Sequence, residues 1–160
     1  MNTPGDKDIQ GSCYCGSVRF SISAGANPYW AGYCHCRDCR QAHAAPLYQY
    51  VYVREPEFRV IEGAHLLKWF TRTESRKDEF KRFFCTICGS KVYNFLIFED
   101  NGNKIELCGT FPSLFDNQET ATNSTWSPRE HVYCAESIMN ISSIQDDLPK
   151  ADGFGEIFPI

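Results

Sequence analysis

The sequence lacks a long apolar run, a strong excess of either charge, and any internal repeat or low-complexity linker. Its 160 residues include 16 Lys and Arg against 20 Asp and Glu, which gives a net charge of −4. Without a basic stripe, bulk electrostatics gives no reason to expect nucleic acid or an anionic membrane surface as a partner. Without an apolar run of sufficient length, the chain is not expected to span a bilayer. We therefore expect no nucleic acid and no membrane among its partners.

The first residues, MNTPGDKDIQG, also lack the apolar core of a signal peptide and the arginine-rich character of a transit peptide. We expect a cytoplasmic protein, with the nucleus as the other option, in which thiols stay reduced. The length suits one substantial core and is too short for two. Residues 1–10 are accordingly expected to form a flexible tail, and residues 11–160 a single domain.

Helical periodicity is scarce, and alternation with a period of two dominates the readable segments. In SVRFSIS, for example, Val18, Phe20 and Ile22 share one face. Further short segments are rich in β-branched and aromatic residues: LYQYVYV, FRVIEG, HLLKWFT, KRFF, KVYNFLIF, KIELCG and HVYC. Only residues 38–45, 113–117 and 138–146 look able to form helical turns. The sequence therefore predicts a mainly β domain with few short helices, in which the aromatic residues of the strands belong to the core.

Cysteine is abundant, with nine residues, and most of them are clustered. Reduced thiols in such number need a reason, and disulfides fit poorly, because the count is odd and the tightest pairs are too close to bridge easily. Seven of the nine fall into three groups, within GSCYCGSVRF, CHCRDC and FCTICGS. We interpret these groups as metal ligands.

The first and third groups together can supply four thiolates. Cys85 and Cys88 form a C-x-x-C-G turn typical of a zinc knuckle, and Cys13 and Cys15 form a C-x-C-G turn. A redox role for the C-x-x-C pair would require a βαβ context, which the sequence does not show. Four thiolates close a tetrahedral site, so we expect a structural zinc that joins the start of the domain to its middle.

The middle group, Cys34, Cys36 and Cys39, offers three sulfurs. An ion with three protein ligands keeps one position for water or substrate, as in catalytic zinc sites. The spacing leaves two alternatives open. The cluster is either an open site, or it is empty or closed by a fourth ligand from the following residues: His35, His43, Cys108 or Cys134.

In this order and separation, GSCYCGSVRF, CHCRDCR and FCTICGS resemble the family of glutathione-dependent formaldehyde-activating enzymes and centromere protein V. IELCGT, REHVYCAES and IQDDLPKADGF extend the resemblance over nearly the whole chain, although Ala44 stands where members commonly have glycine. The resemblance implies a β-tent fold of short antiparallel sheets around a structural zinc. It also implies two Zn²⁺ sites per chain, with partial occupancy of the second allowed. Their ligands would be Cys13, Cys15, Cys85 and Cys88 at the structural site, and Cys34, Cys36 and Cys39 at the catalytic site.

The function implied is that of a carbon–sulfur lyase acting on an adduct of glutathione or a similar small thiol, such as S-hydroxymethylglutathione formed with formaldehyde. Arg37 and Arg40 would hold glutathione carboxylates, although surface arginines with local ion pairs are the simpler interpretation. The alternative within the same family is a non-enzymatic, zinc-stabilised protein-interaction module. The chain could also form a homodimer. A zinc ribbon that binds nucleic acid is disfavoured because acidic residues outnumber basic ones.

The remaining polar and sulfur-bearing residues receive mainly structural roles. His35 lies between two ligands, so we expect it to orient the cluster by a hydrogen bond rather than bind the ion. His43 is interpreted as a loop histidine, with proton transfer as the alternative. Arg82 and Lys91 are more often surface charges than substrate contacts. The other residues considered are His65 and His131 (structural), Cys108 and Cys134 (small buried hydrophobes in strands) and Trp126 (undecided).

Overall fold

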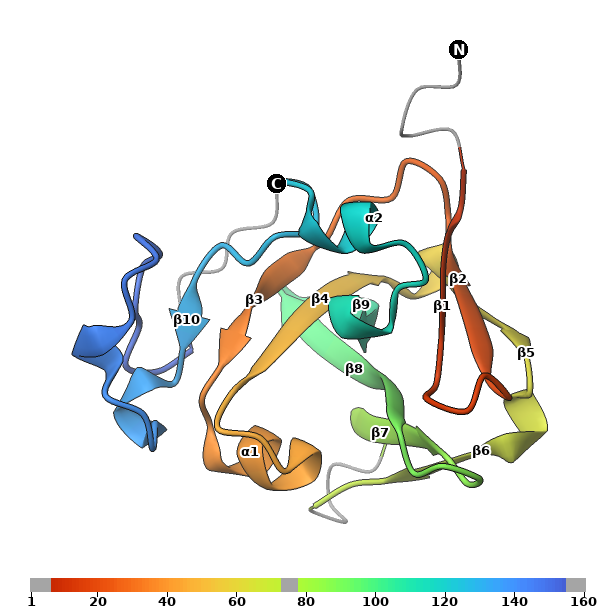
Figure 1. Cartoon of the computed structure of the whole chain (residues 1–160), viewed down its shortest axis with the longest axis horizontal. Coiled ribbons are helices and arrows are strands. Elements are labelled where there is room, and N and C mark those ends of the chain that lie inside the picture. The colour runs from red at the N-terminus through yellow and green to blue at the C-terminus, as the bar shows by residue number, and fades with distance from the viewer. Residues whose placement is uncertain (1–6, 73–77, 155–160) are drawn as a thin grey trace.

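The computed structural model describes residues 7–72 and 78–154, and its main elements are short β-strands arranged in two sheets (Figure 1). A three-stranded sheet has the order β1-β2-β5, and a seven-stranded sheet has the order β10-β3-β4-β9-β8-β7-β6. The strands are β1 (Ile9–Ser12), β2 (Arg19–Ile22), β3 (Trp30–Cys34), β4 (Tyr48–Arg54), β5 (Phe58–Glu62), β6 (Leu67–Phe70), β7 (Phe80–Cys85), β8 (Lys91–Asp100), β9 (Asn103–Thr110) and β10 (His131–Val132). Neighbouring strands are antiparallel, except that β10 runs parallel to β3. The mainly β prediction is confirmed.

Two strands were missed from the sequence. β1 has the sequence IQGS and β3 has WAGYC, and neither shows the alternation of apolar and polar residues that marks a half-buried strand. β3 is buried along almost its whole length, so it needs no polar face. Ile9 and Gln10, which the sequence placed in the flexible tail, pair with β2 in the three-stranded sheet. Residues 1–6 of the predicted tail lie outside the described residues.

Two short α-helices are present among the described residues, α1 (Arg37–His43) and α2 (Gln118–Thr122). α1 confirms the helical turn expected over residues 38–45, and its C-cap is Ala44, whose φ of 49° is left-handed. A 3₁₀ turn at Pro112–Leu114 overlaps the second expected stretch, after which α2 begins at Gln118. Another at Ile141–Ser143 falls in the third. Within the described parts of the chain, no helix has the length and apolar character needed to cross a membrane.

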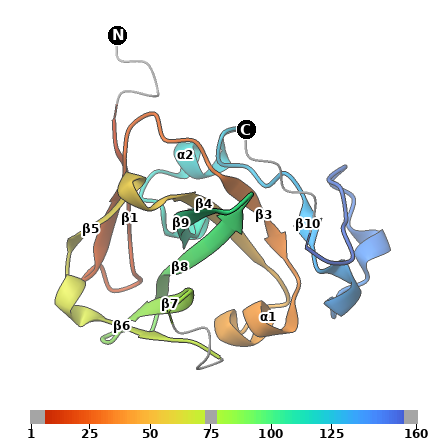
Figure 2. The same ribbon diagram turned by 180° about the vertical axis from the view of Figure 1, so that it is seen from behind.

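The seven-stranded sheet buries apolar side chains on both faces. Along β4, Val51 and Val53 point to one face, and Tyr50 and Tyr52 to the other. The valines join a core cluster with residues of the three-stranded sheet such as Phe20, whereas the tyrosines join a second cluster. In both views the three-stranded sheet and the segment after β10 lie at opposite ends of the molecule (Figure 1, Figure 2). Because the valines and the tyrosines of β4 lie on opposite faces, the seven-stranded sheet separates two core clusters of different composition.

Glycines on neighbouring strands allow two of the β4 tyrosines to pack against the sheet. Gly32 of β3 is paired with Tyr50, and Gly109 of β9 is paired with Tyr52. A Cβ atom at position 32 would lie 2.8 Å from the Tyr50 hydroxyl oxygen, and one at position 109 would overlap the Tyr52 ring. Only glycine at these two positions leaves room for the rings to lie across the adjacent strand.

A chain of buried histidines ties the segment after β10 to the end of β3. His35 Nδ1 lies 3.0 Å from Ser137 Oγ, and His35 Nε2 lies 2.8 Å from His131 Nδ1. His131 Nε2 lies 2.6 Å from an Asp146 carboxylate oxygen, which completes the chain. Both rings are fully buried, and burial together with the neighbouring His131 lowers the pKa of His35. The structural role predicted for His131 therefore consists of joining β3 to the C-terminal segment.

We expect Gly109→Ala to lower the free energy of unfolding by about 1–3 kcal/mol, because the new methyl group forces the Tyr52 ring out of its position. Chemical denaturation followed by circular dichroism measures the effect. Gly153→Ala is the matched control, since a Cβ atom there meets no neighbour within 4 Å. Equal stability of the two variants would contradict the packing argument.

We expect His131→Phe to lower the free energy of unfolding by about 1–3 kcal/mol, because it leaves the buried Nε2 of His35 without its partner. His65→Phe is the control, because His65 is exposed in a 3₁₀ turn. Denaturation curves of both variants against the wild type test this expectation. A change no larger than that of the control would show that the histidine chain contributes nothing to stability.

Candidate functional site

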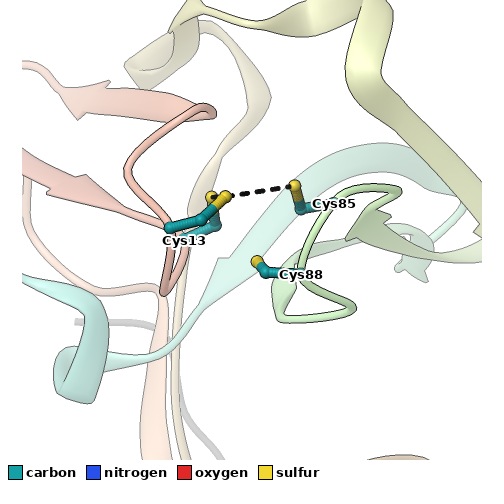
Figure 3. A group of neighbouring side chains, drawn as sticks. Cys13, Cys85 and Cys88 are labelled. Carbon is teal, nitrogen blue, oxygen red and sulfur yellow. Dashed lines mark hydrogen bonds between the residues drawn. The ribbon is translucent and has the colours of Figure 1, made fainter.

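Four thiols converge between two turns that are distant in the sequence. Cys13 and Cys15 lie between β1 and β2, and Cys85 and Cys88 lie at the turn between β7 and β8. The four sulfur atoms all lie within 4.8 Å of one another. Figure 3 shows the side chains of Cys13, Cys85 and Cys88 directed toward a common centre. The structure thus brings together the four residues that the sequence assigned to one ion.

The geometry of this four-thiol group fits a tetrahedral ion. Cys15 Sγ lies 3.5 Å from Cys13 Sγ and 3.9 Å from Cys85 Sγ. Thiolates placed about 2.3 Å from a tetrahedral Zn²⁺ lie roughly 3.8 Å apart, which these separations match. Burial raises the pKa of Cys13 to about 11, so this sulfur needs a cation beside it to be a thiolate near neutral pH. The group can hold zinc, and its four protein sulfurs leave no position for a substrate.

Three further thiols meet where β3 runs into α1. Cys34 is the last residue of β3, Cys36 is the N-cap of α1, and Cys39 lies in its first turn. The Cys36 sulfur accepts a hydrogen bond from the Cys39 backbone N–H at 3.4 Å, as an N-cap side chain does. All three sulfur atoms lie within 4.8 Å of one another. The cap and the helix turn therefore position the three sulfurs toward a common point.

No fourth ligand atom joins the three-thiol group among the His, Cys, Asp and Glu side chains of the described residues. His35 is hydrogen-bonded to Ser137 and His131, and the His43 ring is stacked on Tyr48 with centroids 4.4 Å apart. Cys108 belongs to the core cluster on the other side of the sheet. Cys134, expected in a strand, is buried in the 3₁₀ turn Cys134–Glu136. These contacts account for the four residues that were considered as a fourth ligand.

A cavity of about 370 Å³ opens onto the three sulfurs. Its walls are largely aromatic, and Trp30, Tyr50 and Tyr52 belong both to these walls and to a buried core cluster, as predicted for the aromatic residues of the strands. The aromatic side chains that line it are Trp30, Tyr48, Tyr50, Tyr52, Phe80, Tyr133 and Phe154. The alternation of tyrosine along β4 was visible in the sequence, but it does not reveal whether that face meets another layer or a cavity.

Arg82 is the cation of this cavity and is itself buried. It lies on β7, with Nη2 3.6 Å from Cys39 Sγ and the guanidinium carbon 4.6 Å from the centroid of the Phe80 ring. Hydrogen bonds from Cys34 and Cys36, together with the charge of Arg82, lower the pKa of the Cys39 thiol. Hydrogen bonds with Cys36 and Cys39, together with burial, raise the pKa of the Cys34 thiol. The cluster thus favours an anionic sulfur beside a cation, which suits a metal-binding donor set.

Arg37 and Arg40 do not line this cavity. Arg40 donates from Nε to the His35 carbonyl oxygen and from Nη2 to the Glu136 carbonyl oxygen, each at 3.0 Å. The Arg37 backbone N–H donates to the Glu136 carboxylate at 2.8 Å. The two residues therefore join α1 to the 3₁₀ turn at Glu136, and their predicted contact with glutathione carboxylates stays a prediction.

Two other residues that the sequence singled out lie outside the cavity. The Lys91 ammonium lies over the rings of Phe70 and Phe84, at 4.7 and 5.1 Å from their centroids. Trp126 is buried in the core cluster that includes the three-stranded sheet, where it packs edge-on against Phe115. Trp126 thus anchors its loop.

Comparisons with known proteins agree with this geometry. The profile of the family described as glutathione-dependent formaldehyde-activating enzyme matches residues 8–136. A protein of Halomonas elongata that carries the provisional name of a glutathione-dependent formaldehyde-activating enzyme is 28% identical over 88 residues, which is 54% of this chain and 55% of the relative. The match thus spans about half the length of that relative.

A crystal structure of a Rhodobacter sphaeroides protein is 22% identical, with a TM-score of 0.48, and the match covers 74% of this chain and 97% of the other. At that level the likeness carries no argument about function. The family match is different, because it extends over most of the chain and includes all the cysteines of both thiol groups. The chain therefore belongs to the glutathione-dependent formaldehyde-activating enzyme family.

Proposed function

We propose that this protein is a zinc-dependent carbon–sulfur lyase that makes or breaks the adduct of a small thiol, such as glutathione, with an aldehyde. The observation that carries the proposal is the difference between the two thiol groups. One offers four sulfurs, whereas the other offers three sulfurs that border a cavity, with no fourth ligand atom among the described residues. Three protein ligands are the pattern of a metal site that accepts a substrate.

The reaction balances without an oxidant or reductant. The thiol sulfur adds to the carbonyl carbon, the π bond of the carbonyl breaks, and the thiol proton ends on the oxygen. Zinc held by Cys34, Cys36 and Cys39 would supply a ligand position that favours the deprotonated form of the substrate thiol. Three thiolates make the ion electron-rich, so activation of the thiol suits it better than polarisation of a carbonyl.

The residues of the cavity have matching tasks. Arg82 offsets the negative charge of the sulfurs from 3.6 Å. Burial raises the pKa values of Tyr48, Tyr50 and Tyr52, so their hydroxyl groups stay protonated and can donate hydrogen bonds. The aromatic walls would limit the contact of a bound adduct with water.

We expect about two zinc ions per chain in the purified protein, and loss of one of them in Cys36→Ser without loss of the fold. Cys85→Ser is expected to impair folding, because the four-thiol group joins segments 70 residues apart. Elemental analysis with circular dichroism measures both effects. Cys108→Ala is the matched control, since this buried cysteine belongs to neither group. A single zinc ion whose removal unfolds the wild type would overturn the proposal.

We expect the wild type to accelerate formation of S-hydroxymethylglutathione above its spontaneous rate, and Cys36→Ser to return it to that rate, because the variant lacks a ligand of the open site. Exchange spectroscopy by NMR measures the rate at equilibrium, with Cys108→Ala again as the control. Full zinc content with no acceleration for any thiol and aldehyde would instead favour the zinc-stabilised interaction module.

A further inference from the structure

Tyr133 combines a place in the wall of the cavity with an uncommon backbone conformation. Its φ of 57° and ψ of 40° are left-handed, a region in which a bulky side chain is unusual because its Cβ atom crowds the backbone. Residues held in such strained conformations cluster at functional sites, and they persist only where the surrounding structure enforces them. The conformation of Tyr133 therefore calls for a reason.

The left-handed turn brings two consecutive side chains to the three-thiol group. Val132 is the last residue of β10 and is paired with Cys34 at the end of β3. In a continued strand the side chain after Val132 would point to the opposite face of the sheet. β10 instead ends there, and Val132 and Tyr133 both line the cavity onto which the sulfurs open. The backbone of Tyr133 accounts for this placement.

Backbone hydrogen bonds hold the turn on two sides. The Tyr133 N–H donates to the Gly153 carbonyl oxygen at 2.7 Å, and the Glu136 N–H donates to the Tyr133 carbonyl oxygen at 3.1 Å. The His35 N–H donates to the Val132 carbonyl oxygen at 3.0 Å, which ties the turn to the end of β3. Tyr133 is thus fixed by the strand that carries Cys34 and by the C-terminal segment, so its position is enforced.

The Tyr133 hydroxyl is open to a ligand. The side chain is only partly buried, and within the described parts of the chain its hydroxyl forms no hydrogen bond and is not enclosed. By contrast, Tyr50 and Tyr52 of the same cavity are 4% and 6% exposed. Burial, followed by the charges of Cys34 and Cys36, raises the pKa of Tyr133. Because the charges of these sulfurs act on the hydroxyl, it lies near the three-thiol group.

Resting on the proposed function, we infer that the Tyr133 hydroxyl is the acid that protonates the aldehyde oxygen when the carbon–sulfur bond forms. An electron pair of the sulfur forms the new bond, and the π electrons of the carbonyl move to the oxygen. Tyr133 gives its proton to this oxygen, and its phenolate recovers a proton from water, which had received the proton of the substrate thiol. The role is needed because a three-thiolate site suits activation of the thiol better than polarisation of the carbonyl.

We expect Tyr133→Phe to lower the maximal catalysed rate of S-hydroxymethylglutathione formation about 10²-fold, because the ring remains and the acid is lost. The glutathione concentration that gives half of the maximal rate should not change, since the hydroxyl acts on the oxygen and not on the thiol. Exchange spectroscopy by NMR on the zinc-loaded protein measures both quantities. Tyr29→Phe is the matched control, because Tyr29 is a buried tyrosine of the same core cluster that does not line the cavity.

A structural role of the hydroxyl would have a different signature. Tyr133→Phe would then lose zinc or stability together with activity, which elemental analysis and chemical denaturation measure, and that result would overturn the inference. A loss of rate in Tyr48→Phe but not in Tyr133→Phe would also overturn it. Tyr48 is the rival donor because it is the other tyrosine of the cavity that is only partly buried.

The contact with the oxygen is tested by a spectroscopic measurement that needs no turnover. In protein labelled with ¹³Cζ-tyrosine, the resonance of Tyr133 is the one missing from Tyr133→Phe. We expect the adduct of glutathione and formaldehyde to shift this resonance more than S-ethylglutathione does, because the ethyl compound has a methyl group in place of the hydroxyl. Formaldehyde alone is the blank. Equal shifts with the two ligands would contradict the contact.

The experiments separate this inference from the proposed function. Acceleration that is the same in the wild type and in Tyr133→Phe supports the lyase and overturns the role of Tyr133. A shift specific to the adduct, in a protein that accelerates no addition of a thiol to an aldehyde, supports the contact between Tyr133 and the oxygen and overturns the lyase.

Discussion

The convergence of four thiols from the turn after β1 and the turn after β7 is the interaction on which the rest of the structure depends. It joins chain segments 70 residues apart, and its buried members Cys13 and Cys85 lie in the same core cluster as the valines of β4. In a small β-rich domain the long-range pairing of strands is entropically costly, and an ion bound by the four thiols would offset that cost because it would bind only the folded arrangement. Such an ion would hold the three-stranded sheet against the larger one.

The larger sheet then keeps the two thiol groups apart. One face meets the core that contains Cys13 and Cys85, and the other carries Cys34, Cys39 and the tyrosines. This separation allows one group to be closed by protein sulfurs while the other borders a cavity. The expected structural site and the proposed catalytic site thus lie on opposite faces of a single sheet.

The cavity face departs from ordinary packing in ways that suit binding. A buried arginine stands beside a thiol, aromatic rings border open space, and three buried nitrogens have no hydrogen-bond partner among the described residues. Each feature costs stability in a domain without a ligand. Preorganised donors in a site shielded from water are also what stabilises charge in a transition state. The glycines opposite the tyrosines and the histidine chain behind Cys34 hold this arrangement in place.

The sequence by itself determined both thiol groups, most of the strands and the mainly β class, because ligand spacing and period-two alternation are local patterns. It missed β1 and β3, where burial on both faces or a short mixed sequence removes the alternation. Only the tertiary structure decided that Arg82, and not Arg37 or Arg40, lines the cavity, and that the partners of His35, which the sequence already expected not to bind the ion, are Ser137 and His131. The same holds for the tyrosines of β4, because alternation shows that they share a face but not what that face meets. These outcomes depend on which strands become neighbours, a long-range property that no local pattern records.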